Sequence, residues 1–373
     1  MPNDETPLDW LIDETEKWCK DRAIYIAVMD SIEVLDKKSQ RSTGEIPELL
    51  KDALSVSFDS NIGHDQIEDA EKRYDFYTTE EEKLPFDLEY FNKITKGGLP
   101  NKTLNICLAG TGVGKSLFMC HMASSALMQN KNVLYITLEM SEERIAERID
   151  ANILNIPMKE LPDISKKEYG KKKIGRLKNK TKGKLIVKEY PTASAHVGHF
   201  RHVLQELNIK KDFQPDIIFV DYLNICASQR IRPGAGANSY TLVKSIAEEL
   251  RGLAVENDLP IVSATQTTRS GYGSTDIGLE DTSESFGLPA TADLMFALIT
   301  SDELEELDQL VVKQLKNRYN DPTIFKRFVI GIDRSRMKLY DVEQEAQEEL
   351  IDSDIDDDIP VADRGREKFQ GWK

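Results

Sequence analysis

The sequence predicts an α/β fold with a mostly parallel sheet, preceded by a small helical segment. From Phe86 onward, short uninterrupted apolar runs alternate with segments of helical periodicity, which is typical of a parallel sheet covered by helices on both faces. One of these runs leads into a glycine-rich loop that opens a helix. Before Phe86 the apolar residues recur at helical spacing, so that region is expected to contain helices and linker only.

The first 85 residues are predicted to hold two helical parts. Residues 1–36 carry two apolar runs at helical spacing, which predicts a helical hairpin. Residues 37–85 predict a linker that contains one short amphipathic helix at 46–58, while 59–84 are acidic and poorly periodic. An apolar stripe on a lone helix needs a surface to pack against. That surface is either its own domain or a neighbouring subunit, and the spacing alone leaves both open.

The alternating region, residues 86–342, predicts a single large domain. Strands are expected at 103–108, 132–137, 184–188, 216–220, 260–264 and 293–299. Helices are expected at 115–130, 142–152, 199–207 and 240–257. Residues 310–312, 326–332 and 336–340 predict edge strands or a hairpin. The lysine-rich stretch 166–184 predicts a solvated helical insertion first and a nucleic-acid surface second.

The charge distribution is uneven. A net charge of -16 argues, taken alone, against a nucleic-acid binder. Ten acids and no base fall within residues 341–358, however, which leaves only -6 for the rest of the chain and permits a local basic groove. Residues 343–373 therefore predict an acidic tail. The four cysteines show no paired spacing and no membrane-length apolar run or signal peptide is present, which predicts a cytosolic protein with reduced thiols.

Residues 109–116, Ala-Gly-Thr-Gly-Val-Gly-Lys-Ser, predict a phosphate-binding P-loop because they follow a strand and open a helix. The glycines let backbone N–H groups turn toward phosphate oxygens, and the helix N-terminus adds positive potential. Lys115 is expected to reach the β- and γ-phosphates of ATP, and the Ser116 hydroxyl to bind Mg²⁺. The nucleotide-binding residues are thus Ala109, Gly110, Thr111, Gly112, Val113, Gly114, Lys115 and Ser116.

Three further predicted strands end in side chains that suit ATP hydrolysis. Asp221 ends an apolar strand and predicts a Walker B carboxylate that holds Mg²⁺ through water. Glu139 ends the strand at 133–139 and is the candidate base for the attacking water. Gln266 ends a third strand, where its amide is expected to sense the γ-phosphate. The alternative for each is an ordinary capping or strand-end residue.

In their order along the chain, these motifs resemble the RecA-like P-loop ATPase core of hexameric replicative helicases of the DnaB class. The motifs are the P-loop, Leu-Glu-Met at 138–140, Val-Asp-Tyr-Leu at 220–223, Ser-Ala-Thr-Gln-Thr-Thr-Arg-Ser at 263–270 and, before them, Phe-Asn-Lys-Ile-Thr-Lys-Gly-Gly-Leu at 91–99. The resemblance covers residues 86–342 and is nearest to members of the class from T4-like bacteriophages.

The resemblance implies an active site shared between subunits. The class carries a Lys-x-Arg pair that reaches the ATP of the adjacent subunit, and residues 315–319 match it. Arg318 is then the arginine finger and Lys316 its companion, with an exposed basic strand as the alternative. The resemblance also implies that the helix at 46–58 docks on the next subunit and that residues 1–36 are the remnant of an N-terminal collar.

A ring on DNA is the assembly that the resemblance implies. It implies a homo-hexamer that uses ATP and Mg²⁺ to move 5′ to 3′ on single-stranded DNA and to unwind forked duplex. The expected partners are primase, a helicase loader and other replisome proteins, in the cytoplasm of a phage-infected host and without a membrane. The other functions considered are a RecA-like, filament-forming recombinase ATPase and an ATP-gated DNA-binding scaffold. The linker helix favours closed rings over filaments.

Two loops are expected to face the DNA channel. One follows the Walker B strand and offers Arg230 and Arg232 as phosphate contacts. The other, residues 270–289, includes Glu284, Ser285, Phe286 and Gly287, which resemble a DNA-binding stretch of the class. This chain departs from that stretch with Ser283 in place of an arginine and Ala290 in place of a glutamine. Backbone N–H groups of such a glycine-rich loop can track phosphates with little sequence preference.

Overall fold

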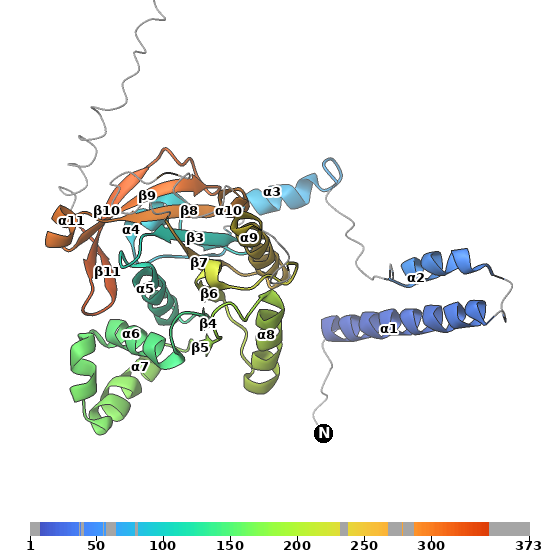
Figure 1. Ribbon diagram of the computed structural model, residues 1–373, viewed down its shortest axis with the longest axis horizontal. Coiled ribbons are helices and arrows are strands. Elements are labelled where there is room, and N and C mark those ends of the chain that lie inside the picture. Colours follow the sequence, from blue (N-terminus) through green and yellow to red (C-terminus); the bar gives the residue numbers. More distant parts are fainter. Residues whose placement is uncertain are drawn as a thin grey trace, which may run out of the picture. The chain divides into compact units, whose positions relative to one another are not determined.

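The computed structural model describes residues 8–36, 38, 41–54, 56, 65–78, 81–231, 238–267, 278 and 287–342. The chain divides into two compact units, Met1–Glu80 and Glu81–Lys373 (Figure 1). The second unit begins five residues before the expected start of the large domain. The predicted acidic tail at 343–373 lies outside the described residues.

The first unit is built from helices. Its elements are α1 (Leu8–Leu35), the 3₁₀ turn η1 (Thr43–Glu45), α2 (Ile46–Leu54) and α3 (Ala70–Thr78). The hairpin expected within residues 1–36 is wrong, because α1 is one unbroken helix of 28 residues. Neither glycine nor proline occurs between its two apolar runs, so nothing there breaks the helix. The short polar helix α3 was not predicted.

A hairpin does form, but between α1 and α2, which pack side by side. Ala27 and Val34 of α1 and Ala53 of α2 are buried. A capping box at the start of η1, in which the N–H of Ser42 donates to the Glu45 carboxylate at 2.9 Å, fixes where the second arm begins. The α2 stripe therefore packs on its own chain, although Leu54 stays 72% exposed. Docking of this helix on a second subunit remains a prediction.

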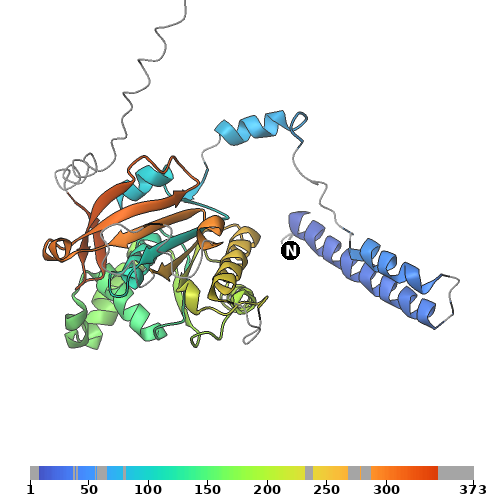
Figure 2. The same ribbon diagram turned by 45° about the horizontal axis from the view of Figure 1, so that its top comes forward.

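The second unit is built around a nine-stranded sheet. Its strands are β3 (Leu104–Ala109), β4 (Val133–Thr137), β5 (Leu185–Glu189), β6 (Ile217–Asp221), β7 (Ile261–Gln266), β8 (Leu294–Ile299), β9 (Gln309–Asn317), β10 (Arg327–Asp333) and β11 (Lys338–Asp341). Their order in space is β11-β10-β9-β8-β3-β7-β6-β4-β5. The six strands from β8 to β5 run parallel, and β9, β10 and β11 extend the sheet antiparallel (orange in Figure 2). The predicted mostly parallel sheet is confirmed.

Helices cover both faces of this sheet. The helices are α4 (Glu89–Thr95), α5 (Lys115–Met128), α6 (Glu142–Leu154), α7 (Gly175–Lys180), α8 (Val197–Lys211), α9 (Ser239–Glu256), α10 (Gly287–Thr291) and α11 (Asp302–Glu306). One core packs α4, α5 and α6 against the sheet, and a second core packs α8, α9 and α10 against the other face. Strand β3 serves both, because Cys107 points into the first core while Ile106 and Leu108 point into the second.

Smaller elements complete the unit. A two-stranded sheet of β1 (Lys83–Leu84) and β2 (Leu99–Pro100) flanks α4, and the short helical turns are η2 (Met158–Asp163) and η4 (Leu223–Ile225). The lysine-rich stretch forms a π-helix, η3 (Glu168–Ile174), that continues into α7, so its predicted helical character is confirmed. Among the described residues, no helix is long and apolar enough to span a bilayer.

The direction of the strands defines two edges of the sheet. We call the edge where β3, β4, β6 and β7 end the carboxyl edge, and the edge where they begin the amino edge. Strand β9 runs antiparallel to β8, and Asn317 near its end pairs with Leu294 at the start of β8. The end of β9 therefore lies at the amino edge. Strand β9 is longer than the predicted strand at 310–312 and includes Lys316.

Candidate active site and arginine finger

The P-loop connects β3 to α5 at the carboxyl edge, as predicted. Gly112 and Gly114 have φ values of +81° and +141°, a region that side chains with a Cβ avoid. The space around a Cβ at Gly112 is open, so backbone conformation rather than crowding requires the glycine. Helix α5 then begins at Lys115, with Gly114 as its N-cap. The N–H groups of a first helical turn have no acceptor within the helix, so this turn is suited to bind phosphate.

Lys115 lies inside this loop and is only 8% exposed. Its ammonium donates to the loop's own carbonyl oxygens, at 3.3 Å to Ala109 and 3.2 Å to Gly110. Burial lowers the pKa of Lys115, and nearby negative groups, Glu139 and Asp221 among them, raise it again. These hydrogen bonds are long and their acceptors are neutral carbonyls, so they are weaker than a bond from the ammonium to a negatively charged phosphate. A phosphate is thus a better partner for Lys115 than the chain itself offers.

Asp221 ends β6 beside Thr137, the last residue of β4. It is 1% exposed, and burial raises its pKa, while the nearby Tyr135 and Ser116 hydroxyls act to lower it. The Tyr135 hydroxyl donates to Oδ2 of Asp221 at 2.8 Å. The other oxygen, Oδ1, is buried without a hydrogen-bond partner. An orphaned carboxylate oxygen close to a serine hydroxyl suits Mg²⁺, a hard cation that prefers oxygen ligands and keeps several waters.

Glu139 and Gln266 lie at the same edge. Glu139 follows β4 by two residues and is exposed, and the preceding N–H, of Leu138, donates to the Asp221 carbonyl at 2.9 Å. The Glu139 charge is close enough to raise the pKa values of Lys115, Asp221 and Tyr222. Gln266 pairs in register with Ala109, the first residue of the P-loop. The structure therefore brings the strand-end residues predicted from sequence together around the loop.

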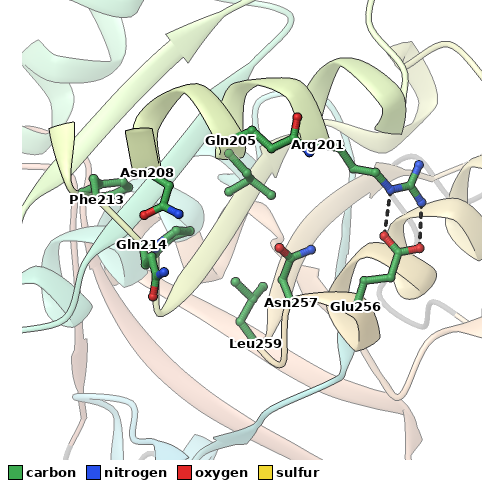
Figure 3. A pocket seen from close by; sticks show the side chains of 10 residues that line it. Arg201, Gln205, Asn208, Phe213, Gln214, Glu256, Asn257 and Leu259 are labelled. Atoms are coloured by element: carbon green, nitrogen blue, oxygen red, sulfur yellow. Dashed lines mark hydrogen bonds and ion pairs between the residues drawn. The ribbon is translucent and has the colours of Figure 1, made fainter. Parts of the chain in front are cut away.

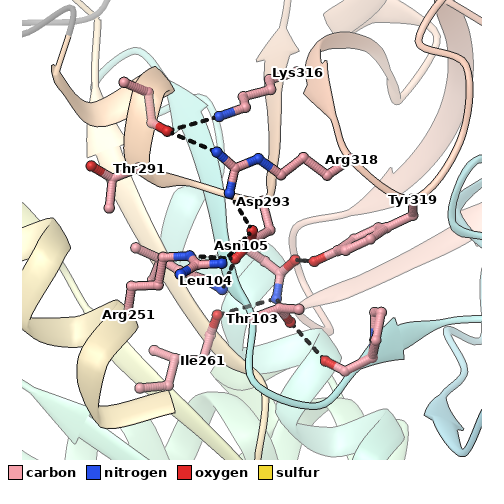
Figure 4. A network of polar contacts seen from close by, with 12 residues as sticks. Thr103, Leu104, Asn105, Arg251, Ile261, Thr291, Asp293, Lys316, Arg318 and Tyr319 are labelled. Atoms are coloured by element: carbon pink, nitrogen blue, oxygen red, sulfur yellow. Dashed lines mark hydrogen bonds and ion pairs between the residues drawn. The ribbon is translucent and has the colours of Figure 1, made fainter. Parts of the chain in front are cut away.

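Lys316 and Arg318 lie at the other end of the sheet (Figure 4). Strand β3 separates the two edges by six residues, or roughly 17–20 Å at the usual rise of an extended chain. Neither side chain can therefore reach phosphates on the P-loop of its own chain. Any P-loop phosphate that Lys316 or Arg318 contacts would therefore have to belong to another subunit.

Three residues that contact the predicted site had not been identified from sequence. Tyr135 supports the Asp221 carboxylate, and Asp293 supports Arg318 with an ion pair of 2.8 Å. Arg334, in the turn between β10 and β11, donates to the Gly112 carbonyl at 3.1 Å. Each of these contacts joins residues that are far apart in the sequence and are brought together by strand pairing or a turn. No local sequence motif identifies any of the three.

The candidate DNA contacts are only partly described. Arg230 is exposed, and its guanidinium pairs with Glu248 at 2.9 Å. Gly287 begins α10 and is buried. Arg232, Glu284, Ser285 and Phe286 lie outside the described residues.

A separate pocket of about 440 Å³ lies between α8 and α9, beside the starts of β6 and β7 (Figure 3). Arg201 and Glu256 close one side of it through a bidentate ion pair of 2.7 and 2.8 Å. None of the residues predicted from sequence for the nucleotide or DNA sites lines this pocket. This pocket is therefore separate from the predicted site, and the P-loop at the carboxyl edge remains the candidate active site.

Comparison with known proteins decides the family. Residues 84–327 match the profile of the DnaB-like helicase C terminal domain. The chain belongs to this DnaB-like helicase family. It is 45% identical over 349 residues to the DnaB-like replicative helicase of Enterobacteria phage T4, covering 90% of this chain and 73% of that protein. Over 207 residues it is 28% identical to the replicative DNA helicase DnaB of Helicobacter pylori, covering 54% of this chain and 40% of that protein.

Solved structures agree with the fold of the family. One, described as a DnaB-like replicative helicase and its interactions with primase, aligns with a TM-score of 0.63 at 16% identity, over 89% of this chain and 78% of that one. Another, described as an ATPase domain, aligns with a TM-score of 0.58 at 17% identity, over 73% of this chain and 96% of that one. The RecA-like ATPase core expected for this helicase is thus confirmed.

Proposed function

We propose that this helicase hydrolyses ATP with Mg²⁺ at the interface between subunits, and that hydrolysis drives a ring 5′ to 3′ along single-stranded DNA at a replication fork. The observation that carries the shared site is the separation of its two halves. The phosphate cradle and carboxylates lie at the carboxyl edge, while Lys316 and Arg318 lie at the amino edge. Only a second subunit can bring one edge to the other.

Within one subunit, each residue at the carboxyl edge has a distinct task. The loop N–H groups and Lys115 bind and orient the β- and γ-phosphates. The Ser116 hydroxyl and the Asp221 carboxylate would hold Mg²⁺, which would supply positive charge to neutralise the phosphates. Glu139 takes a proton from the attacking water, and its exposure gives that water access. Gln266, beside the start of the P-loop, senses the γ-phosphate and passes its state to the loop after β7.

The neighbouring subunit supplies the remaining charge. Arg318 delivers a guanidinium to the transferring phosphoryl group, and Lys316 lies beside it. Comparable fingers accelerate hydrolysis by about 10³–10⁵-fold. An isolated subunit is therefore expected to be a weak ATPase.

Assembly is also supported by the first unit. Helix α1 exposes large apolar side chains along its length, including Trp18 at 66%, Tyr25 at 55% and Leu35 at 63%. Patches of this kind mark contact surfaces with other proteins. We infer that the first unit, including α2, takes part in contacts between the subunits of a hexamer. Primase, a loader and other replisome proteins are the expected partners, in the cytoplasm of a phage-infected cell.

The central test is complementation between two inactive variants. Lys115→Ala removes the phosphate ligand but keeps the finger, and Arg318→Ala removes the finger but keeps the P-loop. Each alone should lose ATP hydrolysis, while a mixture should recover a fraction of it, because some interfaces combine an intact P-loop with an intact finger. A mixture that stays inactive, although both variants co-assemble by light scattering, contradicts the shared site.

The function on DNA is tested with forked substrates. Forks that carry the free single strand on one arm or the other separate the two polarities, and unwinding should require a 5′ arm on which the ring loads. Hydrolysis without strand separation on either fork would exclude a helicase and favour an ATP-gated scaffold. The relatives described above are named replicative helicases, and they give no support to a recombinase.

A further inference from the structure

Asp293, directly before β8, joins four separate elements of the sheet's amino edge (Figure 4). Its side chain is only 5% exposed, and its carboxylate accepts four hydrogen bonds. Arg251 of α9 donates two of them, at 3.1 Å each, and Arg318 after β9 donates one at 2.8 Å. The N–H of Leu104, the first residue of β3, donates the fourth at 3.0 Å.

The backbone repeats these links. The N–H of Asp293 donates to the Leu104 carbonyl at 2.8 Å, and the N–H of Arg318 donates to the Asp293 carbonyl at 2.9 Å. Asp293 is thus fixed to the start of β3 on one side and to Arg318 on the other. Since β3 leads directly into the P-loop, the position of Arg318 is tied to the strand that carries the chain's own phosphate site.

The guanidinium of Arg318 is held on one side and open on the other. Its Nη1 donates to Asp293 and its Nη2 to the Ala290 carbonyl at 3.1 Å, yet 45% of the side chain is exposed. Lys316 donates to the same Ala290 carbonyl at 3.0 Å. Arg251 and Arg318 are paired with the single carboxylate of Asp293, and Lys316 binds only carbonyl oxygens beside them, so the cluster keeps an excess of positive charge. An anion that approaches from outside meets a cation that is already oriented.

We propose that Asp293 is a positioning residue for in-trans catalysis: it fixes Arg318 in the orientation in which the guanidinium reaches the ATP of the neighbouring subunit. In this role Asp293 does not have to contact the nucleotide or the attacking water. It acts by limiting the rotamers of a long side chain, and positioning of this kind contributes to the rate rather than to substrate affinity. The inference rests on the proposed role of Arg318 as a finger.

The test compares Asp293→Asn with a matched variant, Asp216→Asn. Asp216 also stands directly before a parallel strand, β6, and accepts the N–H of Asn132 before the neighbouring strand β4, at 2.6 Å. No arginine is paired with it among the described ion pairs. D293N should lower kcat by about 10–100-fold with KM for ATP within about twofold, because the finger is displaced and not the phosphate ligands. D216N should keep kcat within about twofold.

A double variant separates positioning from other roles. If Asp293 acts only through Arg318, D293N/R318A should hydrolyse ATP as fast as R318A alone. Losses that multiply in the double variant overturn the inference. So does a D293N protein with normal kcat when R318A is slow, which leaves the finger itself intact. An R318A protein with normal kcat instead refutes the proposed function.

Mixed assemblies give a readout that a purely structural role would not move. In a mixture with K115A, the D293N subunit supplies the intact P-loop and the K115A subunit supplies the intact finger. Activity should therefore recover to the level of the K115A and R318A mixture. Paired with R318A, D293N must supply the finger, and activity should stay low. Recovery in both mixtures, or in neither, overturns the inference. Should D293N not fold, Asp293→Glu, which keeps the charge but moves the carboxylate, is carried through the same two mixtures.

Discussion

The two edges of the sheet differ in how far their charged groups are satisfied. At the carboxyl edge, Lys115 has only neutral carbonyl partners and Asp221 keeps one buried oxygen without a partner. At the amino edge, Asp293 accepts four hydrogen bonds. Lys316 donates to two carbonyl oxygens, and Arg318 donates to the Asp293 carboxylate and a carbonyl oxygen. Buried polar atoms without hydrogen-bond partners are typical of a site that binds a ligand. A cluster whose members already have partners is typical of a site that holds a side chain in a fixed orientation.

The largest effect is expected from removing the group that the amino edge presents. Arg318→Ala should lower ATP turnover by about 10³–10⁵-fold, because the charge on the transferring phosphoryl group loses its counter-charge. Single-turnover hydrolysis at saturating ATP measures it. The control is Arg201→Ala, which breaks another arginine–carboxylate pair, with Glu256, outside the site. Equal losses in both variants would mean that the amino edge contributes only structure.

The next largest effect belongs to the carboxyl edge. Glu139→Gln should lower turnover by about 10²–10⁴-fold, since the amide cannot accept the proton of the attacking water. Binding of a fluorescent ATP analogue should be kept. Glu139 is exposed, and it influences the pKa values of Lys115 and Asp221 only through its charge. Glu143→Gln, an exposed acid in the first turn of α6, is the matched control. If E139Q turns over normally, another group is the base.

A smaller effect should follow from loosening the support of Asp221. Tyr135→Phe removes the hydroxyl that donates to Oδ2 at 2.8 Å and leaves the ring stacked on Phe219. Losing one hydrogen bond to a charged group should raise the Mg²⁺ concentration for half-maximal nucleotide binding by about tenfold. Tyr169→Phe, which removes the hydrogen bond that Tyr169 of η3 donates to Asp150 of α6, should leave the Mg²⁺ requirement unchanged. An unchanged Mg²⁺ requirement in Y135F would show that Asp221 needs no such support.

The smallest effect concerns DNA. Arg230 follows the Walker B strand but is already paired with Glu248, so a phosphate must compete with a carboxylate for it. Arg230→Gln should weaken single-stranded DNA binding a few-fold and reduce the slope of log K against log salt by about 0.7, the value for one phosphate contact. Fluorescence anisotropy across a salt series measures both. An unchanged slope would remove Arg230 from the DNA path.

What sequence alone could predict depended on how local the information was. The P-loop lies within eight consecutive residues, and Asp221, Glu139 and Gln266 each end an apolar run. Parallel strands end at one edge, so their convergence followed from the fold class. Asp293 gave no such indication, because its partner Leu104 is 189 residues away and Arg318, 25 residues away, follows an antiparallel strand. Only the strand register reveals the cluster.

The errors in the first unit have a comparable origin. Two apolar runs in residues 1–36 were interpreted as two helices, although the intervening residues continue one helix without strain. Helix α3 carries mixed polar and aromatic residues without an apolar stripe, so periodicity did not mark it. In both cases the pattern of apolar residues was a poor guide because little of the unit is buried.

Strand β3 gives every subunit a direction. One end of β3 leads into the P-loop, and the other end is joined through Leu104 and Asp293 to Arg318, the proposed finger for a neighbour's nucleotide. Under the proposed arrangement, two subunits related by a twofold axis would form either no complete site or two equivalent sites. Such a pair could not be extended into a row of subunits. Head-to-tail contacts instead give a row of n subunits only n−1 complete sites, and closure of the row supplies the last. A closed ring is then required for every catalytic site to be complete. A subunit inserted in the opposite direction would leave the sites at both of its interfaces incomplete.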